Sequence, residues 1–345
     1  MALNSEALAE KYRSMTMDLH QRRILMTNFR STQQEADLTT PPNCSGFGRI
    51  RHFRRATTAG WPINPLPIDP ACAALKLGRR DEIEAQVFQN AACNWRCWYC
   101  FVPFNLLSAD LSHSAWLTAS QLIELYLQQP DKPLVIDLSG GQPELVPEWV
   151  PWMIEELEYK NLRGTVYLWS DDNLSCDYFW RYLSPAQQEL VITYPFYGRA
   201  TCLKGFDKES FEYNTNAEAS MFEFQLDSLR RLVKSGMDVY VYVTLTTPDP
   251  KDIREKMKRF VDGLQDIDKN LPLRTVPLEI LEFSPVRSRL RNIHKSALLH
   301  QWTAVEAWKD ELTLRYSSTD RSIAISDVQL CKTTSVSFAT DEHRN

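Results

Sequence analysis

The sequence predicts an α/β fold built around a parallel sheet. Six segments have the composition of strands, and helix patterns lie between them along most of the 345 residues. Strands that alternate with helices pair in parallel through right-handed crossovers. A chain of this length can form one large domain or two small ones.

The first expected strand, residues 82–89, alternates apolar and polar side chains. This period of two is typical of a strand with one buried face. The second, residues 133–138, is a short apolar run between Pro133 and a pair of glycines, as expected of a strand buried on both faces. The other four strand candidates are residues 165–169, 190–194, 239–245 and 277–283.

The expected helices have recognisable ends. Thr118 and Gln121 have the spacing of a capping box. Ser184 precedes Pro185, which suits the first position of a helix. Further helices are expected over residues 220–236, 252–267 and 296–312. Six strands fall short of the eight in a closed TIM barrel, so we expect a partial (β/α)6 TIM-like barrel with an N-terminal extension.

Three parts of the chain are expected to differ in role. Residues 1–81 begin with a polar helical pattern and end in a proline-rich stretch that favours extended chain. We interpret them as an extension that covers the core, residues 82–295 as the partial barrel, and residues 296–345 as a C-terminal helix and tail. Within the extension lies a basic run, Arg49, Arg51, His52, Arg54 and Arg55.

Composition argues against several classes of protein. The net charge of −5 disfavours a general nucleic-acid coat. No apolar run reaches the roughly eighteen residues of a membrane span, and the N-terminus lacks the apolar centre of a secretory signal. We therefore expect a cytoplasmic protein, whose eight cysteines are reduced.

Three cysteines follow the first expected strand at once. Cys93, Cys97 and Cys100 have C-x3-C-x2-C spacing. A cubane [4Fe–4S] cluster normally takes four thiolates, so three leave one iron open, as in catalytic metal sites. A zinc site would need a second cysteine pair, and a ferredoxin a fourth cysteine at fixed spacing. The isolated cysteines are expected to be small buried apolar residues: Cys176, Cys202 and Cys331.

This loop resembles the cluster-binding motif of the radical S-adenosylmethionine (SAM) superfamily, including the aromatic Tyr99 before the third cysteine. The resemblance covers about residues 82–290. It implies that Cys93, Cys97 and Cys100 bind three irons of a [4Fe–4S] cluster. It also implies that SAM chelates the fourth iron through its amino and carboxylate groups, with Tyr99 near the adenine.

A second motif lies one strand–helix unit later. Gly140, Gly141, Gln142 and Pro143 are similar to the GGEP motif of the same superfamily, with Gln142 replacing the usual glutamate. Glycines at the end of a strand let the backbone approach a ligand closely. The resemblance implies that this loop contacts the SAM amino group. Considered alone, the residues could equally form an ordinary turn.

The third strand ends in Ser170, Asp171 and Asp172. Active sites of such sheets gather at the carboxyl ends of the strands. The resemblance implies contacts from Ser170 and Asp171 to the ribose or methionine part of SAM. The alternative, that the aspartates only turn the chain and cap a helix, has about equal weight.

After the fourth strand, Lys204 lies in a segment that looks like the LKG segment of several radical SAM branches. Lys204 or Arg199 could pair with the SAM carboxylate or with a substrate anion. Thr244 and Thr246 end the fifth expected strand, and Glu282 and Ser284 end the sixth, where the resemblance implies further cofactor contacts.

The resemblance implies a reaction in which the cluster, reduced by flavodoxin or ferredoxin, cleaves SAM to a 5′-deoxyadenosyl radical. The radical then abstracts a hydrogen atom from a small-molecule or nucleotide-type substrate. Other possibilities stay open: a glycyl-radical activase, an RNA-modifying enzyme suggested by the basic run, or a non-catalytic iron–sulfur protein on the same scaffold. The sequence names no substrate.

Overall fold

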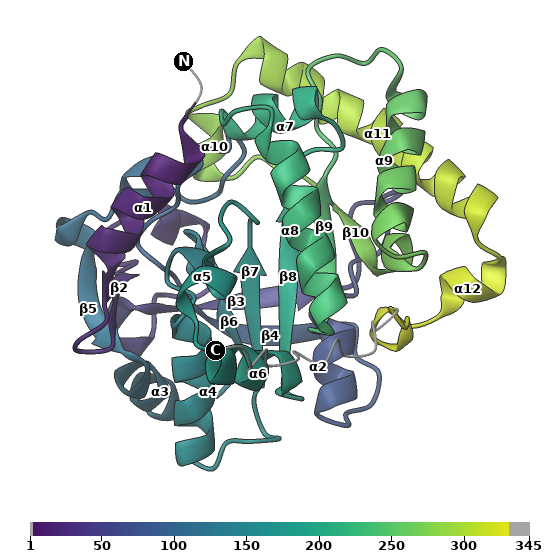
Figure 1. Ribbon diagram of the computed structural model, residues 1–345. Coiled ribbons are helices and arrows are strands. Elements are labelled where there is room, and N and C mark those ends of the chain that lie inside the picture. The colour runs from purple at the N-terminus through teal and green to yellow at the C-terminus, as the bar shows by residue number, and fades with distance from the viewer. Residues whose placement is uncertain (1–2, 331–345) are drawn as a thin grey trace, which may run out of the picture.

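The computed structural model describes residues 3–330 and has a mixed α/β fold, as the sequence predicts (Figure 1). Its main sheet is a curled half-barrel with the strand order β10-β9-β8-β7-β6-β4-β3. The strands of this sheet are β3 (Gly48–Arg54), β4 (Glu82–Phe88), β6 (Val135–Leu138), β7 (Tyr167–Asp172), β8 (Tyr197–Leu203), β9 (Val239–Thr244) and β10 (Thr275–Leu278).

The six strands from β4 to β10 are parallel and follow one another in chain order. Their carboxyl ends therefore meet at one edge of the sheet. Helices connect or flank them. The capping box expected at Thr118 and the cap expected at Ser184 are both present, the latter as a capping box with Gln187. The helices are α1 (Ser5–Thr16), α2 (Ile68–Ala74), α3 (Ala119–Leu127), α4 (Trp149–Tyr159), α5 (Tyr178–Tyr182), α6 (Pro185–Thr193), α7 (Lys208–Thr215), α8 (Met221–Ser235), α9 (Ile253–Ile267), α10 (Ser284–Arg287), α11 (Asn292–Arg315) and α12 (Ser318–Ser322).

One predicted strand is wrong, and another is shifted. Residues 190–194 continue α6, because a helix that starts with a capping box propagates through this β-branched stretch. The strand, β8, begins three residues later. The expected strand 277–283 is shifted toward the N-terminus, because β10 ends at Leu278. Beyond it, Ile280 exchanges both of its backbone hydrogen bonds with the side chain of Gln301 in α11 instead of with a neighbouring strand.

The main sheet buries both of its faces. On the outer face, side chains such as Ile136, Leu168 and Val241 pack against α3, α4, α8 and α9. On the inner face, Trp169 and Tyr242 belong to a second cluster that α2 covers. Burying each large apolar side chain contributes about 1.5–3 kcal/mol. Because side chains alternate along a strand, each residue near the carboxyl edge belongs to one face only.

The N-terminal segment adds elements to this core. α1 lies beside β2 (Arg23–Thr27), which pairs with β1 (Met17–Asp18) and β5 (Ser114–Thr118) in a small antiparallel sheet (Figure 1). Inside the core, Arg13 of α1 forms a buried ion pair with Glu148. The basic run forms β3, which pairs antiparallel with β4 along its whole length. The sequence patterns did not predict this strand.

The C-terminal helix α11 starts at Asn292 and is longer than the expected 296–312. Within residues 3–330, no helix combines the length and apolar character needed to cross a membrane.

Candidate functional site

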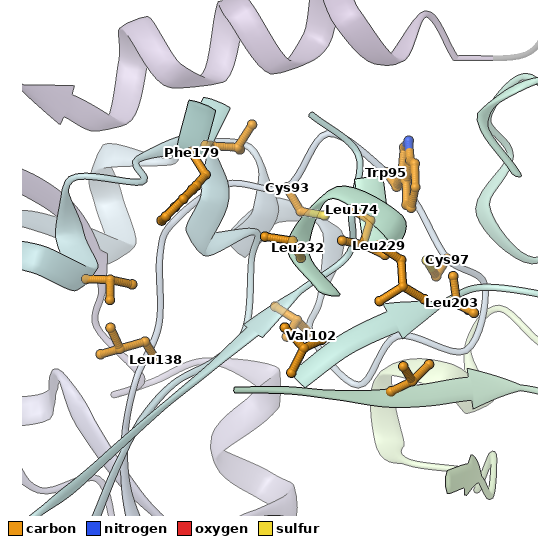
Figure 2. Close-up of a cluster of buried hydrophobic side chains, with 14 of the residues drawn as sticks. Cys93, Trp95, Cys97, Val102, Leu138, Leu174, Phe179, Leu203, Leu229 and Leu232 are labelled. Atoms are coloured by element: carbon orange, nitrogen blue, oxygen red, sulfur yellow. The ribbon is translucent and has the colours of Figure 1, made fainter. Parts of the chain in front are cut away.

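The loop after β4 brings the three cysteines to the carboxyl edge of the sheet. Cys93 and Cys97 are buried and Cys100 is partly exposed, and all three thiols are free. Figure 2 shows Cys93 and Cys97 within the same cluster of buried side chains as Leu174 and Leu203. Cys176 and Cys202 are free and partly buried, away from this loop in the sequence, and Cys331 lies outside the described residues.

Two arginines hold the cysteine loop in place, and sequence reasoning assigned neither a role. Arg96, within the loop, donates to the carbonyl oxygens of Cys93 and Leu107, at 2.5 and 3.2 Å. Arg289, almost two hundred residues away, donates to the carbonyl oxygens of Cys100 and Val102 at 2.6 and 2.8 Å. A guanidinium group offers several donors in fixed directions, so each arginine satisfies carbonyls that the irregular loop leaves open.

Burial and nearby cations have opposite effects on the thiols. Burial raises the pKa of Cys97 to about 12, while the Lys204 ammonium group opposes the rise. Burial likewise raises the pKa of Cys93. Free thiols with raised pKa values are poor nucleophiles, so the loop does not have the properties of a thiol catalyst.

The positions of the three cysteines bear on two kinds of metal centre, a single zinc ion and an iron–sulfur cluster. A single tetrahedral zinc ion needs its sulfur ligands roughly 4 Å apart, since each bond is about 2.3 Å. Within residues 3–330, no three His, Cys, Asp or Glu side chains converge in this way. In a [4Fe–4S] cluster each thiolate binds a different iron of one compact core, so the sulfurs lie farther apart than at zinc but still face one centre. The three-cysteine loop fits that requirement in its number and type of donors.

The glycine-rich loop after β6 packs directly on the cysteine loop. Gly140 and Gly141 have φ values of +90° and +66°. A Cβ atom on Gly140 would lie 2.3 Å from Oε1 of Gln89, and one on Gly141 would lie 2.3 Å from the carbonyl oxygen of Asn90. Both positions therefore require glycine. The N–H of Gln142 also donates to the carbonyl oxygen of Ala92 at 2.7 Å.

The side chain of Gln142 supports these loops internally. Its Nε2 donates to Oδ1 of Asp172 at 2.9 Å, and its Oε1 accepts from the N–H of Asn173 at 3.0 Å. Asn173 in turn donates through Nδ2 to the sulfur of Cys93 at 3.6 Å. Hydrogen bonds to cluster sulfurs influence the reduction potential of iron–sulfur centres. The sequence patterns assigned no function to Asn173, although it contacts the cysteine loop. Pro143, the last residue of the glycine-rich motif, is buried and starts a short 3-10 helix.

Tyr99 joins the cysteine loop to the end of β9. Its hydroxyl is 2.9 Å from Oγ1 of Thr244, and both residues are buried. Lys204, one residue beyond β8, is partly exposed and forms no ion pair with any residue between 3 and 330. Neighbouring Cys202, Tyr99 and Cys97 raise the pKa of Lys204, against the effect of its burial. The structure therefore brings Tyr99, Thr244 and Lys204 together beside the thiols.

Strand alternation separates other residues that the sequence grouped. Asp171 is on the inner face, where it accepts a hydrogen bond from Ser139. Ser170 points the other way, with its hydroxyl 2.7 Å from that of Tyr197. Arg199 is on the same outer side and pairs with two carboxylates: Glu144 at 2.8 Å and Asp172 at 3.4 Å. Ser170 and Arg199 are thus separated from Lys204.

The other residues expected at strand ends lie in different parts of the structure. Asp172 turns the chain, as the alternative held, because it accepts from the N–H of Leu174 at 2.7 Å. Thr246 donates to Asn214 at 2.7 Å. Ser284 donates to Asp37 of the N-terminal segment, and Glu282 is exposed.

Comparison with known proteins adds no assignment to this geometry. No family model matches the chain, and no curated protein is significantly similar to it. A functional assignment must therefore come from the residues themselves.

Proposed function

We propose that the chain is a radical SAM enzyme and that its curled sheet is a partial (β/α)6 TIM-like barrel. The observation that carries the proposal is the close packing of the two motifs. A three-cysteine loop follows the first parallel strand, and Gly141 of the next unit has room for no side chain against its backbone. The two motifs are about forty residues apart in the sequence, yet they are in direct backbone contact at the same edge.

The residues have distinct parts in this proposal. Cys93, Cys97 and Cys100 would hold a [4Fe–4S] cluster, with one iron free for SAM. When bound, the reduced cluster and SAM supply one-electron cleavage to a 5′-deoxyadenosyl radical, which abstracts a hydrogen atom from the substrate. Flavodoxin or ferredoxin would donate the electron. Reduced thiols persist in the cytosol, which is the compartment that we propose.

The chain's own side chains would bind and orient the cofactor. The backbone of Gly140 and Gly141 is available at the edge, while the Gln142 side chain is already bonded within the protein. Lys204, which has no carboxylate partner among the described residues, would pair with the SAM carboxylate. Tyr99, fixed by Thr244, would lie against the adenine.

The ion pairs of the basic run give no support to the RNA-modifying alternative. That alternative depended on the basic run, most of which lies in β3. Arg51 pairs with Asp137 and Asp171, Arg54 with Glu82, and Arg55 with Asp69. Charges neutralised in this way do not provide a phosphate-binding surface.

Anaerobic reconstitution with iron and sulfide tests the proposal. We expect about four irons per chain, broad visible absorption, and release of 5′-deoxyadenosine from SAM after reduction. Cys97→Ala should lose both iron and SAM cleavage, whereas Cys202→Ala, which removes a thiol outside the loop, should retain iron. A chain that binds the cluster but releases no 5′-deoxyadenosine would contradict the enzyme proposal, and one that binds zinc instead of iron would contradict the cluster.

A further inference from the structure

Four charged side chains meet on the inner face of the sheet, next to the cysteine loop. We call Arg49, Arg51, Asp137 and Asp171 the inner charge cluster. They come from β3, β6 and β7, which are separated in sequence but close in the sheet. Arg51 donates to Oδ2 of Asp137 at 3.3 Å and lies 3.8 Å from Oδ2 of Asp171. Arg49 is 5% exposed and Asp137 is fully buried.

Arg49 has no anionic partner among residues 3–330. Its Nε and Nη2 atoms are buried without a hydrogen-bond acceptor, and it forms no ion pair there. Its guanidinium carbon lies 5.1 Å from the ring of Phe101 and 5.9 Å from that of Phe29. Such contacts contribute about 0.5–2 kcal/mol, less than the several kcal/mol that burying a cation costs. Burial accordingly lowers the pKa of Arg49 to about 10.

The two aspartates have open acceptor atoms, just as Arg49 has open donors. Oδ1 of Asp137 and Oδ1 of Asp171 are buried and accept no hydrogen bond from the described residues. Burial, followed by the charge of Asp171, raises the pKa of Asp137 to about 7 in spite of Arg51. Arg51 contacts only Oδ2 of each aspartate, and Arg49 acts on Asp137 through its charge without forming an ion pair. Oδ1 of each carboxylate therefore stays open to a further donor.

No protein group among residues 3–330 fills these open positions. Buried polar atoms in folded proteins nearly always have partners, and the arginine that directly follows β3 has several, although its Nε is also open. Arg55 pairs with Asp69 and also donates to the carbonyl oxygen of Arg80. Within the inner charge cluster, Arg49 has two open donors, and Asp137 and Asp171 each have an open acceptor. That pattern is typical of a ligand site.

The cluster also has the position that a substrate needs. Phe101, which contacts Arg49, follows Cys100 directly in the cysteine loop. Asp171 is bonded to Ser139, which directly precedes Gly140. The inner charge cluster thus lies between the two motifs assigned to the cofactors. Two arginines and two aspartates have a net charge of zero, so the cluster favours a ligand whose own charges cancel.

We propose that the inner charge cluster binds a zwitterion of the α-amino-acid type as the substrate of the radical reaction. The ligand carboxylate pairs with Arg49, and its ammonium group lies between Asp137 and Asp171. As a statement about the substrate, this inference rests on the proposed function. The binding itself is measured independently of SAM cleavage.

The probes are the twenty common L-amino acids, titrated calorimetrically into the reconstituted full chain with SAM present. We expect at least one to bind, and its methyl ester, which lacks the carboxylate, to bind more weakly. Arg49→Gln and Asp137→Asn should each weaken binding about tenfold or more, as expected for loss of a charged hydrogen bond. The matched control is Arg54→Gln, an exposed arginine of the same strand, which should leave the affinity unchanged.

Thermal unfolding without amino acid separates a ligand role from a structural one. Because Arg49 has no anionic partner, Arg49→Gln should not lower the melting temperature. A marked loss of stability would overturn the inference, as would a wild-type chain that binds none of the twenty. Equal weakening by Arg54→Gln, or competition between the amino acid and SAM for one position, would also overturn it.

The two proposals fail in different ways. A chain that releases 5′-deoxyadenosine but binds no amino acid leaves the radical SAM function in place and removes this inference. A chain that binds an amino acid through Arg49 but never cleaves SAM retains the site and removes the enzyme proposal.

Discussion

Replacing Gly141 by alanine tests whether the two motif loops depend on one another. At this position φ is +66°, where a side chain costs about 1–2 kcal/mol. The new Cβ would also lie 2.3 Å from the carbonyl oxygen of Asn90 and 2.6 Å from that of Ala92. Both are backbone atoms of the segment that leads into Cys93, so they cannot move without displacing the cysteine loop.

The magnitude follows from these two effects. Overpacking of a well-packed region typically costs about 1–3 kcal/mol. Added to the conformational term, Gly141→Ala should lower the free energy of unfolding by about 2–5 kcal/mol. Because the displaced backbone carries Cys93, the variant should also bind less iron after reconstitution than the wild type.

Gly236→Ala is the matched control. Gly236 ends α8 with a φ of +81°, and no heavy atom would lie within 4 Å of an added Cβ. This variant should lose only the conformational term, about 1–2 kcal/mol, and keep its iron. Urea unfolding monitored by circular dichroism measures both variants. Equal losses of stability, or full iron content in Gly141→Ala, would refute the close packing of the loops.

Three further results are expected. In a double-mutant cycle, Tyr99→Phe and Thr244→Val should show a coupling free energy of about 1 kcal/mol, since each removes the same hydrogen bond; additive losses would contradict it. Because the pKa of Asp137 is about 7 rather than 3.8, the folded chain holds a proton that the unfolded chain releases. Stability should therefore fall as pH rises from about 4 to about 7, and Asp137→Asn should flatten this decline in urea titrations. Arg13→Ala leaves Glu148 buried without its cation and should cost about 3–5 kcal/mol in thermal unfolding, whereas a loss below 1 kcal/mol would mean that α1 is held by other contacts.

Local signals in the sequence predicted much of the fold. Ser184 with Pro185 predicted the start of α6, and the apolar alternation of residues 82–89 predicted β4, because caps and short-range periodicity are properties of neighbouring residues. The same kind of signal failed for residues 190–194. Their β-branched side chains suit a strand, but the helix begun at the cap continues through them.

The basic run shows a different limit of local patterns. Its charges suggested an exposed surface, yet Gly48–Arg54 forms an edge strand with Arg49 buried. Only the pairing of this segment with β4, and the approach of Asp137 and Asp171 from other strands, gives the arginines their surroundings. The charges and their spacing are visible in the sequence, but their partners are not.

By itself, the sequence determined most of the parallel strands and helices and the composition of the two loops, because these depend on residues close together in the chain. The three cysteines and the two glycines were identifiable for that reason. Only the tertiary structure decided which side chains share a face. Ser170 and Asp171 are adjacent in sequence but point to opposite sides of β7, while Arg49 and Asp171 are far apart in sequence and meet on one. Strand register and sheet order fix these relations, and both depend on packing between distant segments.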